Sequence, residues 1–92
     1  MLRITTIEIE SGIKELQLSG SISDAWVEEL RECCEPWLAA GNTVILDLKD
    51  VQYADYAGLE LISKLKSRNV TVIRLTPLVA RLLEAHEAQR TE

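Results

Sequence analysis

The sequence predicts an α/β domain in which a mixed four-stranded sheet is packed by three helices. Segments typical of strands and helices follow one another in the order strand, strand, helix, strand, helix, strand, helix. Ser11 and Gly12 form a turn signal between the first two strands, so we expect a hairpin with an antiparallel first strand. The later strands are joined through helices, and such connections nearly always produce parallel neighbours.

Length and composition fit one domain over residues 1–92. A chain of 92 residues with 47% hydrophobic side chains is within the usual size of a single folded unit. The formal net charge is −5, with 15 acidic residues against 10 basic ones. Nucleic acids and anionic membrane surfaces attract basic patches. We therefore expect neither to be a partner.

The two cysteines and the N-terminus indicate the cytoplasm. The first residues, MLRITTIEIESG, lack the apolar core of a signal peptide, and no apolar run approaches the ~20 residues of a spanning helix. Cys33 and Cys34 are adjacent and cannot pair without severe distortion. Free thiols are typical of a reducing compartment. With a single distant histidine in the chain, we expect no metal site and no cofactor.

The N-terminal half begins with strands expected at Leu2–Glu10 and Ile13–Ser19. The polar cluster Ser21–Asp24 should end the second strand, and Ser23 or Asp24 should cap the helix that follows.

That helix is expected over Ala25–Ala40. Pro36 should kink or shorten its last turn, and Gly41 fits the left-handed position that ends helices. Helical spacing predicts its apolar stripe: Trp26, Leu30, Cys33 and Trp37, with Val27, Cys34 and Leu38 beside them. The opposite face is acidic and should be solvated: Glu28, Glu32 and Glu35.

The C-terminal half begins with a strand at Thr43–Leu48, whose near-continuous apolar run predicts a buried central position. A helix at Tyr56–Ser67 and a strand at Val70–Leu75 follow. Thr76 and Pro77 are a strong start signal for a final helix. Apolar positions of the two helices are expected to be buried: Leu59, Leu61, Ile62 and Leu65 in one, and Val79, Leu82, Leu83 and His86 in the other.

Residues with catalytic chemistry are few, and we expect no enzyme. His86 is the single histidine and lies on an apolar helix face, so it should be a packing residue near a helix end. Gly58 stands without a second glycine or a lysine nearby, unlike a phosphate-binding loop.

The junction DYAG, residues 55–58, is the candidate site. Asp55 should cap the helix by accepting from the N–H of Ala57 or Gly58. Gly58 costs roughly 1 kcal/mol against alanine in a helix, so we expect it to admit a closely approaching backbone. A helix N-terminus also suits an anion, and the nearest cations for one are Lys49 and Lys64.

Three segments together resemble the STAS domain family of bacterial anti-sigma-factor antagonists and related sulfate-transporter domains. They are Gly20 with the polar helix start after it, VILDLKDVQYADYAGLELI with Asp47 closing its strand, and VTVIRLTPLVARLL. The resemblance implies the family fold and a non-catalytic switch module in signalling and transcription regulation. The chain looks like a minimal version, because it stops soon after the last predicted helix.

In regulatory members of the family, the residue after the junction aspartate is a serine or threonine that a partner kinase phosphorylates. Tyr56 occupies that position here, and Ala57 follows. The resemblance therefore implies a protein-binding site that is not switched by serine phosphorylation. The residues expected to contact the partner are Asp55, Tyr56, Ala57, Gly58 and Leu59. The alternative is that neither tyrosine contacts a partner, with Tyr53 packed under the loop and Tyr56 lying along the helix surface.

Two kinds of partner follow from the resemblance. The first is an anti-sigma-factor kinase or a similar regulator. The second is the cytoplasmic ATPase of an ABC transporter of the phospholipid-trafficking type, on which the protein would dock as a small STAS subunit. The second is favoured by the missing serine.

Overall fold

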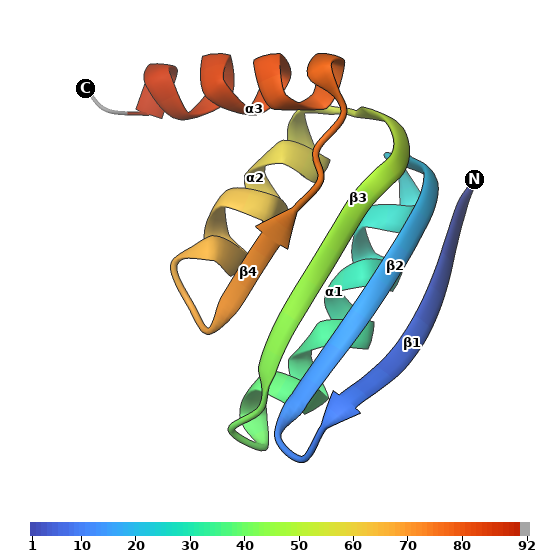
Figure 1. The fold of residues 1–92 in the computed structure, drawn as a ribbon. Coiled ribbons are helices and arrows are strands. Elements are labelled where there is room, and N and C mark those ends of the chain that lie inside the picture. The colour runs from blue at the N-terminus through green and yellow to red at the C-terminus, as the bar shows by residue number, and fades with distance from the viewer. Residues whose placement is uncertain (91–92) are drawn as a thin grey trace.

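The computed structural model describes residues 1–90 and has the predicted element order (Figure 1). The elements are β1 (Leu2–Glu10), β2 (Ile13–Ile22), α1 (Ala25–Ala39), β3 (Thr43–Ala54), α2 (Tyr56–Lys66), β4 (Val70–Ile73) and α3 (Pro77–Arg90).

The four strands form one mixed sheet in the order β1-β2-β3-β4. β1 pairs antiparallel with β2, while β2 with β3 and β3 with β4 are parallel, which confirms the predicted fold class. Because both crossovers proceed in the same direction along the sheet, α1 and α2 lie on the same face of it. Figure 1 shows these two helices behind the strands and α3 across the end of the sheet where β3 finishes.

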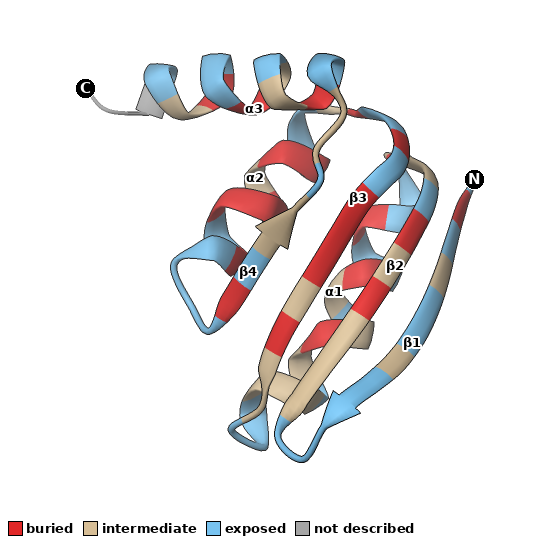
Figure 2. Ribbon diagram, viewed as in Figure 1, coloured by how far each residue is buried: buried red, intermediate tan, exposed pale blue. Residues whose placement is uncertain are grey.

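The core lies between the sheet and the helices α1 and α2. Leu16 of β2, Leu46 of β3 and Ile62 of α2 are completely buried within it. All four apolar residues predicted for α2 are buried, as are Val79 and Leu83 of α3. Figure 2 shows the buried positions concentrated on β2, β3 and the helix faces that meet them.

β3 is twice as long as expected, and the prediction that it ends at Leu48 is wrong. The strand continues to Ala54 and pairs with the end of β2, with register shifts between Gln17 and Ser19 and between Gly20 and Ser21. Irregular pairing of this kind breaks the two-residue alternation that marks a strand in a sequence.

Asp47 consequently lies inside β3 and does not close it. Its side chain is only 1% exposed. The Lys49 N–H donates to Oδ1 over 3.1 Å, and the Arg74 guanidinium Nε lies 3.5 Å from Oδ2. Oδ2 accepts no hydrogen bond among the described residues, so the charge of Arg74 is its compensation.

Two other strand ends also differ from the prediction. β2 extends to Ile22 instead of Ser19, because Gly20 takes a φ of 110° and continues the pairing beside the Met1 carbonyl. β4 stops at Ile73 instead of Leu75. Arg74 has a φ of 57°, which turns the chain out of the strand toward α3.

The start of α1 overturns two expectations. Asp24 occupies the N-cap position, but its side chain makes no capping hydrogen bond. The fully buried stripe is Val27, Leu30 and Cys34, whereas Trp26 is 37% exposed. The predicted stripe was therefore centred about one residue away from the face that the sheet covers. Large rings at a helix start can remain partly outside the core, and periodicity alone does not reveal this.

Pro36 does not end α1, which runs three residues further to Ala39. Pro36 supplies its carbonyl to the Ala40 N–H at 3.1 Å, so the last turn closes after it. Gly41 follows with a φ of 89° and donates its N–H to the Leu38 carbonyl, which confirms its predicted left-handed position.

The predicted starts of the other two helices are confirmed. Asp55 caps α2 through its side chain. At α3, Thr76 Oγ1 accepts from the Val79 N–H at 3.3 Å and donates to the Val51 carbonyl at 3.1 Å. Thr76 therefore both caps α3 and ties its start to β3. Within residues 1–90, no helix combines the length and the apolar character needed to cross a membrane.

Candidate functional site

Asp55 fixes the junction between β3 and α2. Its Oδ1 atom accepts from the Gly58 N–H at 2.8 Å, as the sequence predicted. Its Oδ2 atom accepts from the Asp24 N–H at 3.0 Å, so one carboxylate joins the starts of α1 and α2. Both oxygens are thus engaged within the domain. Asp55 therefore positions the surrounding residues, and each of its two oxygens accepts one hydrogen bond inside the domain.

Gly58 allows α2 to rest directly on the end of β2. It is buried, and a Cβ atom at this position would overlap the Ile22 carbonyl oxygen. The same carbonyl accepts from the Asp55 N–H at 3.2 Å. The expectation that Gly58 admits a close backbone is confirmed, and the junction is held from both β2 and α1.

The five residues expected to contact a partner occupy different environments. Tyr56 is 70% exposed, and Ala57 is exposed beside it. Leu59 belongs to the core cluster, while Asp55 is half-buried and Gly58 buried. Contact between this junction and a partner protein stays a prediction. Tyr56 and Ala57 are the two of the five residues that are exposed to solvent.

His86 contributes a contact that sequence reasoning missed. It is 5% exposed, as expected of a packing residue, but its Nε2 atom lies 2.8 Å from Glu60 Oε1. The Tyr56 ring meets the imidazole edge-on, with 4.9 Å between ring centroids. A clue in the sequence is that Tyr56 and Glu60 are four residues apart and so share one helix face. Only the packing of α3 against α2 brings His86 to that face.

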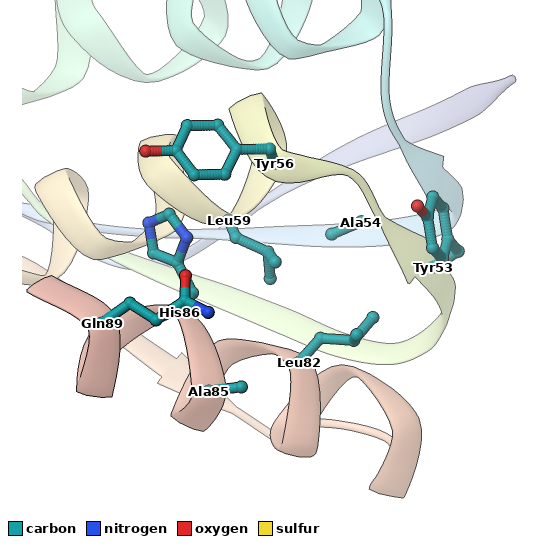
Figure 3. Close-up of a pocket in the computed structure, with 8 residues that line it drawn as sticks. All are labelled: Tyr53, Ala54, Tyr56, Leu59, Leu82, Ala85, His86 and Gln89. Carbon is teal, nitrogen blue, oxygen red and sulfur yellow. The ribbon is translucent and has the colours of Figure 1, made fainter.

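A cleft of about 240 Å³ opens between the junction and α3. Figure 3 shows Tyr53 and Tyr56 on opposite sides of it, with the α3 side chains forming the remaining wall. Its lining comes from two parts of the chain: Tyr53, Ala54, Tyr56 and Leu59 from β3 and α2, and Leu82, Ala85, His86 and Gln89 from α3. Tyr53 is a half-exposed strand residue here, so the expectation that it packs under a loop is wrong.

Exposed apolar side chains gather at the end of the domain that contains the cleft. Because helices begin where the parallel strands finish, the starts of α1, α2 and α3 all lie at this end. We call these four exposed residues the carboxyl-end surface: Trp26, Tyr53, Tyr56 and Leu78. By contrast, Ile9 is 50% exposed near the β1–β2 turn, at the other end of the sheet.

Other chemistry at these elements is limited. Burial raises the pKa of the Cys34 thiol to about 12, with the neighbouring Cys33 and Glu35 adding to the effect, so it is a poor nucleophile. Among residues 1–90, no three histidine, cysteine or carboxylate side chains meet in a metal-binding cluster. Lys64 lies in the last turn of α2, far from the helix N-terminus that an anion would occupy.

Comparisons with known proteins agree with this architecture. The family model described as the STAS domain matches residues 5–91. No curated protein is a match.

Solved structures of anti-sigma factor antagonists share the fold. The anti-sigma factor antagonist SpoIIAA in its unphosphorylated form has a TM-score of 0.76 at 15% identity, with 92% of this chain and 81% of that chain covered. An anti-sigma factor antagonist from Mycobacterium paratuberculosis has a TM-score of 0.80 at 16% identity, with 99% and 82% covered.

Proposed function

This chain belongs to the STAS domain family, and from that membership we propose that it is a non-catalytic regulatory module of the anti-sigma-factor antagonist type. It would bind a protein partner through the junction at residues 55–59 and the adjoining carboxyl-end surface. The observation that carries the proposal is the position of Tyr56. A 70% exposed aromatic ring stands at the start of α2, on a junction that Asp55 and Gly58 hold from inside.

An exposed tyrosine on a fixed backbone suits protein recognition. Tyrosine is enriched at protein interfaces because it offers a flat apolar ring with a polar tip. Contact between the Tyr56 and His86 rings restricts Tyr56 before any partner arrives. Binding then costs less side-chain entropy than it would with a freely rotating ring.

Regulation by serine phosphorylation at the junction does not fit this chain. Residue 56 is a tyrosine and residue 57 an alanine, so neither presents the short hydroxyl that the family's regulatory members carry. The phenol oxygen of Tyr56 lies at the end of a long side chain, whereas a serine hydroxyl at this position would lie close to the backbone. We therefore propose that phosphorylation at this position does not control the release of the partner.

The favoured partner is an anti-sigma factor kinase or a related cytoplasmic regulator, since both structural neighbours are described as anti-sigma factor antagonists. A second candidate is the cytoplasmic ATPase of an ABC transporter of the phospholipid-trafficking type. The residues Tyr56 and Ala57 favour it, because a transporter subunit requires no phosphorylation switch. Either partner would place the protein in the cytoplasm.

Affinity capture from the native host, followed by calorimetry with the purified partner, tests the proposal. Recovery of an anti-sigma factor supports the first candidate, and recovery of an ABC ATPase supports the second. Tyr56→Ala should then weaken binding by about tenfold or more, as expected for an interface anchor. Its circular dichroism and melting temperature should stay unchanged.

Ile9→Ala is the matched control, because it truncates an exposed apolar residue at the opposite end of the sheet. It should bind as the wild type does. Equal binding by Tyr56→Ala and the wild type, or loss of binding in Ile9→Ala alone, would refute the proposed surface.

A further inference from the structure

We infer that Glu60 and His86 are positioning residues for Tyr56: together they hold its ring in the orientation that a partner meets. The inference rests on the proposed function and adds two residues, one from α2 and one from α3, that control the same surface. Each acts through the Tyr56 ring, so neither has to touch the partner.

The imidazole of His86 joins two residues of α2. Tyr56 and Glu60 are four residues apart, so they lie on one face of the helix, about one turn from each other. The His86 ring meets the Tyr56 ring edge-on, with 4.9 Å between the ring centroids, and its Nε2 atom lies 2.8 Å from Glu60 Oε1. One side chain of α3 therefore contacts both residues. Figure 3 shows it reaching from α3 toward the Tyr56 ring.

Glu60 determines how the imidazole is oriented. An ionised carboxylate only accepts hydrogen bonds, so the contact with Glu60 requires a proton on His86 Nε2. The ring cannot turn over without losing this bond. The His86 side chain is only 3% exposed, which leaves water little access to replace the carboxylate. The edge of the imidazole that faces Tyr56 is consequently fixed.

The helix that carries His86 is held at both of its neighbouring elements. At the start of α3, Thr76 Oγ1 donates to the Val51 carbonyl of β3 at 3.1 Å. Directly after His86, Glu87 Oε2 accepts from Ser63 Oγ of α2 at 3.0 Å. The imidazole therefore reaches Tyr56 from a backbone that is fastened to β3 and to α2.

Tyr56 benefits from this support because the residue is 70% exposed. A freely rotating side chain loses its rotamer freedom when a partner binds, which costs roughly two- to tenfold in affinity. A ring that already rests on His86 has lost that freedom before binding. The contact between Glu60 and His86 should therefore be measurable as partner affinity.

Nuclear magnetic resonance on the free protein tests the positioning. The measurements are the nuclear Overhauser effects between the Tyr56 and His86 rings and the couplings that report the χ1 angle of Tyr56. The wild type should show ring-to-ring effects and one dominant χ1 rotamer. Glu60→Ala should lose the ring-to-ring effects and average the couplings between rotamers. Glu60→Gln should restore both, since its amide oxygen can accept from His86 Nε2.

His86→Leu is the second variant, because it keeps a buried apolar side chain and removes both contacts of the imidazole. It should average the Tyr56 couplings as Glu60→Ala does. Wild-type couplings in these two variants, or averaged couplings in the wild type, would overturn the inference.

Two control variants change neighbouring contacts and leave the Glu60–His86 pair in place. Lys64→Ala removes the ammonium group 3.9 Å from Glu60, and Glu87→Gln alters the carboxylate that Ser63 and Lys66 contact. Both should keep the wild-type couplings of Tyr56. Averaging in either control would show that the general packing of α3 on α2 orients the ring, and it would overturn the specific role of Glu60 and His86.

Calorimetry with the captured partner tests the consequence for binding. Glu60→Ala should weaken binding by about two- to tenfold. Glu60→Gln should bind as the wild type does. In a Tyr56→Ala background, Glu60→Ala should have no further effect, because the ring through which it acts is gone.

The outcomes separate this inference from the proposed function. Loss of binding in Tyr56→Ala together with wild-type binding in Glu60→Ala overturns the inference while the proposed surface stands. An equal effect of Glu60→Ala with and without the Tyr56 ring would mean that Glu60 contacts the partner directly, and it overturns the inference as well. Wild-type binding by Tyr56→Ala, with the Tyr56 ring averaged in Glu60→Ala, refutes the proposed function while the positioning of Tyr56 stands.

Discussion

The carboxylate of Asp55 accepts the backbone N–H of Asp24 at 3.0 Å, across 31 residues of sequence. Through this bond the starts of α1 and α2 are fixed to each other, and through Oδ1 the same side chain caps α2. The exposed residue Tyr56 directly follows Asp55, and the exposed Trp26 is two residues after Asp24. The placement of the proposed partner surface therefore depends on one internal carboxylate.

Asp55→Ala should destabilise the domain by about 1–3 kcal/mol. A lost N-cap costs about 0.5–2 kcal/mol, and the Asp24 amide loses its acceptor as well. Asp55→Asn should have an intermediate stability, since asparagine caps well but has one acceptor oxygen. Urea unfolding of the three proteins measures this order. Wild-type stability in Asp55→Ala would show that the two hydrogen bonds contribute nothing.

Gly58→Ala should also destabilise, by about 1–3 kcal/mol, because its Cβ atom would overlap the Ile22 carbonyl and force α2 away from β2. Helix propensity alone predicts the opposite, a gain of about 1 kcal/mol. The two effects thus differ in sign, and the urea midpoint decides between them. Ala57→Gly, at the exposed neighbouring position, is the control and should lose about 1 kcal/mol through propensity only.

Ionisation of the buried Cys34 thiol should destabilise the domain in alkaline solution. Its folded pKa is raised from 9.0 to about 12, mainly because the thiol is buried. The contribution of the neutral thiol to the free energy of unfolding is therefore complete below pH 9. It is lost as the pH rises from 9 toward about 12, by at most about 1.4 kcal/mol per pH unit. Lysines and tyrosines titrate in the same range, so the informative quantity is the difference from Cys34→Ala. Parallel stability curves for the two proteins would contradict the prediction.

Protonation of Glu87 should cause a smaller loss of folding stability in acid. Partial burial opposes the shift, but hydrogen bonds from Lys66 and Ser63 and the charge of Lys66 hold the pKa of Glu87 below its usual 4.5. Its contribution is present above pH 4.5 and is lost as the pH falls through the lowered folded value. Glu87→Gln should flatten the acid limb of the stability curve slightly, because the pair is solvent-exposed. An unchanged acid limb would exclude this contact between α2 and α3 as a source of stability.

Incubation with a captured partner kinase and labelled ATP should leave the wild-type chain unlabelled. Tyr56→Ser restores a short hydroxyl at the position that follows the junction aspartate, and it should become labelled by the same kinase. Phosphopeptide mass spectrometry locates the label. Stoichiometric labelling of wild-type Tyr56 would contradict the proposal that this junction is not switched by phosphate.

The sequence by itself determined the order and type of all seven elements, the hairpin turn and the caps of α2 and α3. These features depend on local properties: hydrophobic period, turn residues and hydrogen bonds that reach three residues along the chain. Asp55 and Gly58 were recognisable for that reason. The sequence left Tyr56 open between packing along the helix and contact with a partner, and its 70% exposure was decided by the tertiary structure.

Only the tertiary structure decided where β3 ends, which face of α1 is buried, and how Asp24 is used. Each depends on partners distant in sequence: irregular pairing with β2, the sheet beneath Trp26 and Val27, and the carboxylate of Asp55. The cleft is the clearest case. His86 and Tyr56 meet because α3 folds back over α2, and no periodicity within either helix specifies a contact between two side chains 30 residues apart.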